Sequence, residues 1–361
     1  LHTPGHTMES TTYLLRDSSN KDVAIFSGDT LFLGDVGRPD LAQKSGKITQ
    51  DDLAGILFES LRTKIMPLAD DVLVYPAHGS GSACGKNLSK ETVGTLGEQK
   101  KTNYALRADM TKKEFIREVT DGLLPPPRYF PLNVKMNKDG YKDIDKVLKT
   151  GTTALDPNSF EKLANQKRVI ILDVRHQDDF AKEHIPQSIF IGLDGGFAPW
   201  AGTMIGDITL PILLITPNGR EEETVTRLAR VGFDNTLGYL KGGLKAWKKD
   251  KRVTDSINCI GAKKFFELDK NEGLDIFDLR KQSEYASEHI PFSQNIPLDV
   301  INQNMNLLPK VSPFYIHCAG GYRSMIAASI LKSRGIHNFI DVKGGLGAIK
   351  KTGIALINSI T

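Results

Sequence analysis

Cysteine is scarce in this chain, with three residues among 361. Three thiols cannot build a disulfide framework, and free thiols are typical of reducing compartments, so we expect a cytoplasmic protein. No apolar run approaches the roughly 20 residues of a membrane-spanning helix, and no signal peptide is recognisable, so no membrane partner is expected. Basic residues number 47 and acidic residues 43, and a net charge of +4 does not indicate a nucleic-acid partner.

An internal repeat organises the second half of the chain. Asp173 recurs as Asp278 and His184 as His289, each 105 positions later and each within the same short motif. In both copies apolar strands alternate with helical stretches, a pattern that predicts an open, parallel α/β sheet with right-handed crossovers. The proline-rich segment 123–131 precedes the repeat and favours an extended connector. We therefore expect three domains, at residues 1–135, 136–250 and 251–361.

One cysteine occupies a position that suits catalysis. Cys318 follows a predicted strand and precedes a helix that begins near Arg323. The positive end of a helix dipole stabilises a thiolate, and Gly320 and Gly321 allow backbone N–H groups to turn inward. Arg323 adds a positive charge on the same rim. The loop is therefore expected to hold an anionic persulfide, thiosulfate or sulfite; the alternative is a buried, inert thiol.

The second copy resembles the rhodanese family over residues 250–361. The resemblance rests on Asp278–Arg280, Glu288–Pro291 and the loop from Cys318 to Ser324. A tyrosine phosphatase loop is the alternative, but it carries one more residue before the arginine. The resemblance implies sulfurtransferase chemistry, with Cys318, Arg323 and Ser324 as catalytic residues and Ala319, Gly320, Gly321 and Tyr322 binding the substrate.

The first copy lacks the thiol. Alignment of the repeats places Thr216 opposite Cys318, and the loop before Arg220 is shorter. Residues 136–250 therefore resemble an inactive rhodanese-like domain that serves docking, dimerisation or orientation of the active copy; anion-binding regulation is the alternative. Cys259 falls opposite Ala154, which predicts a small, apolar, buried position and a structural thiol.

Three potential metal ligands lie in the front part of the chain. His6, Asp29 and His78 lie next to glycines, and an apolar run that predicts a strand precedes Asp29 and His78. Side chains at strand ends meet at one edge of a sheet, and imidazole with carboxylate suits a first-row metal. The ordered set resembles the metallo-β-lactamase superfamily over residues 1–135, which implies part of an αββα domain with His6 and Asp29 as ligands and His78 lining the site.

The superfamily's first ligand motif, His-x-His-x-Asp-His, does not occur in the sequence, and the chain opens at Leu1 rather than Met. We therefore expect that an N-terminal portion is missing and that the metal site is partial. Two members of the superfamily compete, a two-zinc thioester hydrolase of the glyoxalase II type and a persulfide dioxygenase with one Fe(II). The segments Gly37–Asp40 and Tyr75–Gly79 look more like the dioxygenase, and so does the fusion to a rhodanese.

The resemblance implies one iron per metal domain, with zinc as the alternative. Arg38 is expected to steer an anionic thiol carrier or to form a structural salt bridge, and Cys84 to approach the metal or the persulfide or to be a packed thiol. The expected partners are low-molecular-weight persulfides, thiosulfate or sulfite, and a second copy of the chain in a homo-oligomer. Two further interpretations stay open: a sulfur carrier with inactive front and middle domains, and a zinc hydrolase fused to a rhodanese.

Overall fold

The computed structural model describes residues 1–41, 47–80, 82, 84–86, 88–123, 130, 136 and 139–358, with only the backbone of 270–272. The chain divides into two compact units, Leu1–Val134 and Lys135–Thr361. The connector predicted at 123–131 falls almost wholly outside the described residues. Within the described ranges, no helix is long and apolar enough to cross a membrane.

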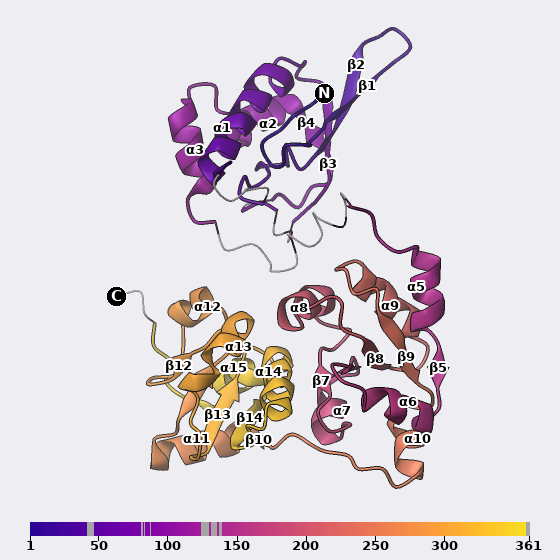
Figure 1. Cartoon of the computed structure of the whole chain (residues 1–361). Coiled ribbons are helices and arrows are strands. Elements are labelled where there is room, and N and C mark those ends of the chain that lie inside the picture. Colours follow the sequence, from indigo (N-terminus) through magenta and orange to yellow (C-terminus); the bar gives the residue numbers. More distant parts are fainter. Residues whose placement is uncertain are drawn as a thin grey trace. The chain divides into compact units, whose positions relative to one another are not determined.

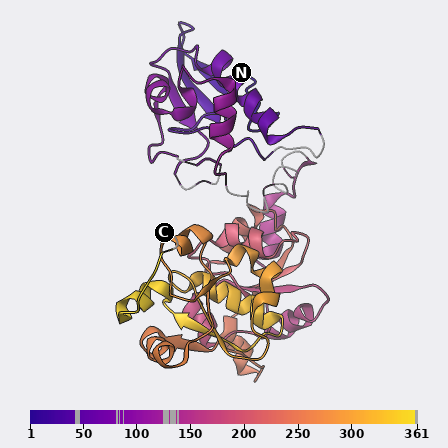
Figure 2. The same cartoon turned by 90° about the vertical axis from the view of Figure 1, so that its left-hand side faces the viewer.

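The front unit is a four-stranded sheet with helices on one face (Figures 1 and 2). Strands β2 and β3 are parallel, and both edge strands run antiparallel to their neighbours. The strands are β1 (Tyr13–Arg16), β2 (Asp22–Gly28), β3 (Leu73–Pro76) and β4 (Gly94–Thr95). The helices are α1 (Gln50–Ser60), the π-helical turn η1 (Leu61–Ile65), α2 (Leu96–Thr102), the 3-10 turn η2 (Tyr104–Leu106) and α3 (Lys112–Thr120).

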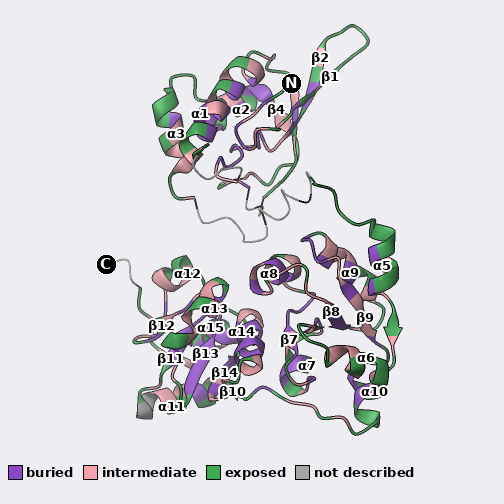
Figure 3. Cartoon of the chain, in the orientation of Figure 1, coloured by how far each residue is buried: buried purple, intermediate pink, exposed green. Residues whose placement is uncertain are grey.

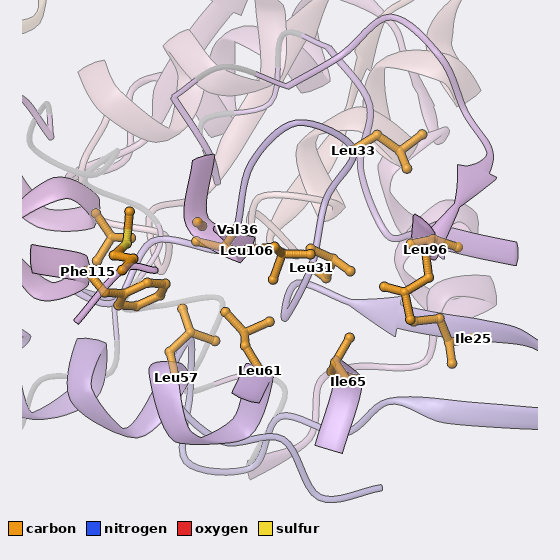
Figure 4. Packing of buried hydrophobic residues seen from close by; sticks show 14 of the residues in the cluster. Ile25, Leu31, Leu33, Val36, Leu57, Leu61, Ile65, Leu96, Leu106 and Phe115 are labelled. Carbon is orange, nitrogen blue, oxygen red and sulfur yellow. The ribbon is translucent and has the colours of Figure 1, made fainter. Parts of the chain in front are cut away.

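Helix α1 supplies much of the core beneath this sheet. Thr49 starts the helix with a capping box, because its hydroxyl accepts from the Asp52 N–H and the Asp52 carboxylate accepts in return. Leu57 and Leu61 are four residues apart, so they share one face of the helix, and both are fully buried (Figure 4). This face packs against the apolar side chains that follow β2, which fixes where the loops at the strand ends lie.

The other face of the front sheet is apolar and exposed. Tyr13, Phe26 and Tyr75 are register partners across β1, β2 and β3, and they are 71%, 47% and 38% exposed. The rings of Phe26 and Tyr75 stack with centroids 5.3 Å apart. Among the residues described, the helices of this unit therefore cover the sheet on one side only.

The second unit contains two all-parallel five-stranded sheets of identical topology, β5-β9-β8-β6-β7 and β10-β14-β13-β11-β12 (Figure 1). The strand order is what two tandem copies of one small domain require. The first copy contains α5 (Ile144–Gly151), β5 (Ala154–Leu155), α6 (Pro157–Ala164), β6 (Ile170–Asp173), α7 (Gln177–Lys182), β7 (Ile189–Phe190), α8 (Phe197–Met204), β8 (Ile212–Ile215), α9 (Glu221–Ala229), β9 (Thr236–Leu240) and α10 (Gly243–Lys249). The second contains β10 (Cys259–Gly261), α11 (Ala262–Glu272), β11 (Ile276–Asp278), α12 (Gln282–Ser287), β12 (Gln294–Asn295), η3 (Leu298–Val300), α13 (Ile301–Asn304), η4 (Met305–Leu307), β13 (Phe314–His317), α14 (Tyr322–Ser333), β14 (Phe339–Lys343), α15 (Gly345–Ile349) and η5 (Lys350–Thr352).

The repeated Asp-x-Arg motif is structural in both copies. Asp278 is fully buried, and Arg280 binds both of its oxygens while donating to the Glu288 carbonyl. Asp173 and Arg175 repeat this arrangement in the first copy. A bidentate pair with additional hydrogen bonds is the form in which a buried carboxylate is tolerated, so the motif stabilises the end of each central strand.

The two copies pack directly on each other through helix α14. It lies between its own sheet and strand β7 of the first copy (Figure 1), and it is buried along most of its length (Figure 3). The Ser329 hydroxyl accepts from the Phe190 N–H of the first copy at 2.9 Å. The Lys332 ammonium binds the carboxylate of Asp255, in the segment that joins the two copies, at 2.6 Å. The helix that follows the cysteine loop is therefore also the main contact with the first copy.

The repeat also placed Cys259 opposite Ala154, and both residues begin the corresponding edge strands. The expected burial is wrong, however, because Ala154 is exposed and Cys259 is only half-buried. In the first copy this edge strand is β5, and Ala154 at its start is exposed to solvent. In the second copy a groove of about 900 Å³ runs past Cys259, lined also by Asp178 and Ala181 of helix α7 and so by both copies.

Candidate functional site

Cys318 lies in the loop that joins strand β13 to helix α14. Gly321 directly precedes the helix with φ of 99°, a conformation that glycine favours, and its N–H donates to the Cys318 Sγ at 3.1 Å. Cys318 is 1% exposed, whereas Ala319 and Gly320 are exposed. The start of α14 therefore directs a backbone donor at the sulfur, an arrangement that stabilises negative charge on it.

Helix α15 holds the cysteine loop from the other side. The Leu346 N–H donates to the Cys318 carbonyl at 2.7 Å, and the Gly347 N–H donates to the Ala319 carbonyl at 2.9 Å. A Cβ atom at Gly345 would lie 2.3 Å from the Cys318 oxygen. The close approach explains why this position is glycine, and it fixes the backbone on both sides of the thiol.

Arg323 lies on the first turn of α14, but its charge is shared. Its guanidinium binds both carboxylate oxygens of Glu284, on helix α12, at 2.6 and 2.9 Å. The hydrogen bonds from Arg323 lower the pKa of Glu284 to about 2. The sequence predicted Arg323 as a fixed positive charge on the rim, and the structure places an ion pair there, so an incoming anion meets a neutralised guanidinium.

Ser324 is fully buried beneath the loop. Its hydroxyl lies 3.2 Å from the Gly321 carbonyl and also contacts the carboxyl of Asp341 on strand β14. Ser324 is thus linked to the sulfur through Gly321, because its hydroxyl bonds the Gly321 carbonyl and the Gly321 N–H donates to the Cys318 Sγ. Its catalytic role stays a prediction.

Tyr322 points away from Cys318 and into the first copy. Its hydroxyl donates to the Gly192 carbonyl at 2.6 Å, and its ring lies edge-on to Phe190 with centroids 5.9 Å apart. A Cβ atom at Gly195 would lie 2.3 Å from the ring, so the phenol occupies space that exists only because Gly195 has no side chain. Gln177 adds a longer contact from the first copy, donating to the Gly320 carbonyl at 3.4 Å. The predicted role of Tyr322 in substrate binding remains untested, and its observed contacts join the two copies.

The three predicted metal ligands of the front unit converge at the ends of β2 and β3. Asp29 follows β2 and His78 follows β3, and these strands are parallel neighbours. The Asp29 carboxylate lies 3.1 Å from the His6 Nε2 and 3.4 Å from the His78 Nε2. The His6 Nδ1 bonds the Arg38 carbonyl at 2.8 Å, which leaves Nε2 directed at the cluster, as in metal-binding histidines.

Cys84 joins this cluster as a fourth potential donor. Its sulfur, an Asp29 oxygen and a His78 nitrogen all lie within 4.8 Å of one another. Burial raises the pKa of Asp29, but hydrogen bonding and charge from His6 outweigh it, and the pKa is lowered overall. Burial raises the pKa of Cys84. This donor set of imidazole, carboxylate and thiol fits a transition metal.

Arg38 lies beside this cluster, and its positive charge opposes the rise in the pKa of Cys84 that burial causes. Its guanidinium binds both oxygens of Asp40, at 2.6 and 2.7 Å, and the residue is 5% exposed. Its backbone instead links the site, accepting from His6 and donating to the Cys84 carbonyl at 3.0 Å. Of the two roles expected for Arg38, the structural salt bridge is the one that these contacts describe.

Comparison with known proteins agrees with both resemblances. A model of the rhodanese-like domain family matches residues 156–250 and 262–352. The chain belongs to the rhodanese-like family. A solved metallo-β-lactamase of Staphylococcus aureus is 31% identical, with a TM-score of 0.57, and the match covers 67% of this chain and 66% of that one.

Two curated relatives each match about a third of the chain. The mitochondrial persulfide dioxygenase of Homo sapiens is 31% identical over 134 residues, which is 37% of this chain and 44% of that protein. The hydroxyacylglutathione hydrolase GloC of Haemophilus influenzae is 33% identical over 108 residues, 30% of this chain and 40% of that protein. The chain thus spans less than half the length of these relatives. Together the matches show a metallo-β-lactamase-like unit fused to two rhodanese-like domains, which confirms the predicted α/β fold class.

The first rhodanese-like copy has no equivalent of the cysteine loop. Its Thr216 hydroxyl bonds the Glu221 carboxylate at 3.1 Å. Arg220 binds Asp194 at 2.5 Å and Glu223 at 2.9 Å. The retained arginine is therefore neutralised by two carboxylates, which disfavours the alternative of anion binding there.

Two residues that shape the cysteine site were not found from the sequence. Glu284 lies in a repeated segment, and its position in the first turn of a helix is the sequence feature that could have indicated it. Asp341 gave no signal, because a single aspartate inside an apolar strand is recognisable as buried only from the fold. Both are carboxylates whose partners belong to another helix or strand, Arg323 for Glu284 and Ser324 for Asp341.

Proposed function

We propose that the chain is a bifunctional enzyme of sulfane-sulfur metabolism, in which a persulfide dioxygenase is joined to a sulfurtransferase that carries sulfur on Cys318. The observation that supports the second activity best is the hydrogen bond from the Gly321 N–H to the Cys318 Sγ at the start of α14. A persulfide on this thiol ends in an anionic sulfur, and inward-facing backbone N–H groups suit such an anion.

The sulfur transfer has a direct test. Wild-type protein is incubated with thiosulfate or a small persulfide, and its intact mass is recorded beside those of Cys318→Ser and Cys259→Ser. Wild type and Cys259→Ser should gain roughly 32 Da, one sulfur atom, and Cys318→Ser should gain nothing. Cys259 is a suitable control because burial raises the pKa of its thiol to about 12. Equal gain by Cys318→Ser, or no gain by wild type, would refute the assignment.

The front unit is proposed to hold the metal of a dioxygenase. His6 and Asp29 would help to hold one Fe(II), with His78 lining the site, and that iron would supply the activation of O₂ and of the persulfide. In the overall reaction one persulfide, one O₂ and one water give one thiol and one sulfite. The sulfite released could accept the sulfane sulfur of Cys318 to form thiosulfate, which gives a reason for joining the two activities in one chain.

Metal content and oxygen uptake separate this proposal from its alternatives. Iron near one equivalent, with oxygen consumption on addition of a persulfide, supports the dioxygenase. Two zinc ions with thioester hydrolysis would instead indicate the hydrolase, which is the activity named for GloC. If Cys318 acquires sulfur but neither oxygen consumption nor thioester hydrolysis is found, the chain acts as a sulfur carrier only. His6→Ala should lower the metal content, whereas His2→Ala should not, because the His2 imidazole is bonded to the Met8 carbonyl.

A further inference from the structure

Asp341 is a buried carboxyl for which the described residues provide no ion pair. It lies on strand β14, next to the strand that leads to Cys318, and is 2% exposed. Its Oδ1 has no hydrogen-bond partner within the described residues. By contrast, Asp278 in the same sheet is equally buried and is bound by a guanidinium. Burying an unpaired carboxylate is costly, so Asp341 requires another explanation.

A short chain of contacts connects Asp341 with the sulfur. The carboxyl contacts the Ser324 hydroxyl, the hydroxyl lies 3.2 Å from the Gly321 carbonyl, and the Gly321 N–H donates to the Cys318 Sγ at 3.1 Å. A serine hydroxyl has one proton to donate. When Ser324 donates it to Gly321, Asp341 can bond to Ser324 only as a donor, which requires the protonated carboxyl.

Ionisation of Asp341 would rearrange this chain. A carboxylate accepts hydrogen bonds only, so it would take the Ser324 proton and release the Gly321 carbonyl. The carbonyl and the N–H of Gly321 belong to neighbouring peptide groups that are joined at its Cα, where φ is 99°. A shift of the released carbonyl would therefore change the direction of the N–H that donates to the sulfur. A negative charge beneath the loop would also oppose a negative charge on Cys318.

The surroundings of Asp341 favour its neutral form. Burial raises the pKa of Asp341 to about 7, and the Ser324 contact and the charge of Lys343 offset burial only in part. Strand β10 contributes Cys259, its register partner, and helix α7 of the first copy contributes Asp178, a like charge. The other groups lining this crevice, from α14 and α15, carry no charge.

We propose that Asp341 is a positioning residue for the Cys318 site: protonated, it holds Ser324 and Gly321 so that the backbone N–H supports an anionic sulfur, and ionised, it withdraws that support. The proposal deepens the sulfurtransferase function proposed above. The hydrogen bond from the Gly321 N–H to the sulfur is therefore supported while Asp341 is protonated, and this support is lost as the pH rises and Asp341 ionises.

The test is the rate at which iodoacetamide alkylates Cys318 in the full chain, followed by peptide mass spectrometry from about pH 5 to about pH 9. In wild type, the rate should depart from a single titration near the transition of Asp341, by up to about tenfold, the order expected for one hydrogen bond to a charged group. Asp341→Asn cannot ionise and can still donate to Ser324, so its profile should follow one titration. Asp71→Asn makes the same change at a carboxyl whose side chain is 59% exposed, and this matched control should keep the wild-type profile.

An unchanged second inflection in Asp341→Asn would overturn the proposal, and so would a wild-type profile that follows a single titration. Should Asp341→Asn fail to fold, Ser324→Ala interrupts the same chain while keeping the carboxyl, and it must lose the inflection as well. Alkylation does not depend on sulfur transfer. A chain that shows the inflection but never acquires sulfur therefore refutes the proposed function and leaves the positioning role intact.

Discussion

A single methyl group added to the first rhodanese-like copy should disturb the cysteine loop of the second. In Gly195→Ala the new Cβ would lie 2.3 to 2.8 Å from ring atoms of Tyr322, the residue that follows Gly321 in the cysteine loop. Neither side can yield easily, because the ring is held by the Gly192 carbonyl and by Phe190. Overpacking of this kind costs about 1–3 kcal/mol.

For a unit of this size that cost corresponds to a fall in melting temperature of about 2–10 °C. Thermal unfolding of the full chain measures it, and sulfur loading of Cys318 in the same samples measures the effect on the site. Gly261→Ala is the matched control, because a Cβ there meets nothing within 4 Å, and it should change neither quantity.

The double variant Gly195→Ala/Tyr322→Ala provides the decisive comparison. Removing the ring relieves the clash, so the two substitutions should be strongly non-additive in the free energy of unfolding. Additive effects, or a Gly195→Ala protein as stable as Gly261→Ala, would refute the idea that the first copy holds the loop through Tyr322.

Three other substitutions test separate parts of the structure. Glu284→Gln removes a pair that depresses the carboxyl pKa from 4.5 to about 2; since Glu284 is partly exposed, the loss should be only about 1 kcal/mol. That contribution is present above pH 4.5 and disappears as the pH falls through about 2, so acid unfolding should begin at a higher pH in the variant. Asp278→Asn leaves the buried Arg280 charge without its carboxylate, and urea unfolding should show a loss of about 3–5 kcal/mol. His6→Ala should lower the metal bound per chain, measured by elemental analysis after dialysis.

The substitution of the buried Asp278 has a matched control at the surface. Asp71 pairs with Lys21 at the surface, with side chains 59% and 62% exposed, so Asp71→Asn should change the stability by less than about 1 kcal/mol. An Asp278→Asn protein as stable as Asp71→Asn would contradict the structural role of the motif. Likewise, equal acid stability of Glu284→Gln and wild type would show that the ion pair with Arg323 does not form in solution.

Much of the architecture followed from sequence periodicity. The offset of 105 positions between Asp173 and Asp278 predicted two copies of one domain, and the two sheets have the same strand order. Glycines beside Cys318 predicted a loop that opens a helix. These features depend on local backbone preferences and on repetition, both of which are visible in the order of residues.

What the sequence could not predict depends on contacts between distant segments. Tyr322 belongs to the loop by sequence, but its ring packs against the other copy, 130 residues away from Gly192. Cys259 was expected to be buried because alanine stands at the equivalent position, yet its environment is set by helix α7 of the first copy. Neither arrangement can be inferred before the faces that the two copies share are known.

Because Tyr322 packs on Gly195, two regions of the first copy should differ in how well they tolerate amino-acid substitutions. Thr216 stands where the second copy has its thiol, so no sulfur chemistry is expected of Pro217 and Asn218, and these two positions should accept substitutions readily. Gly192 and Gly195 still form the surface on which the active loop rests. In a library of single substitutions, these two glycines should be as intolerant as the residues around Cys318, although they belong to the copy that has no cysteine in its loop.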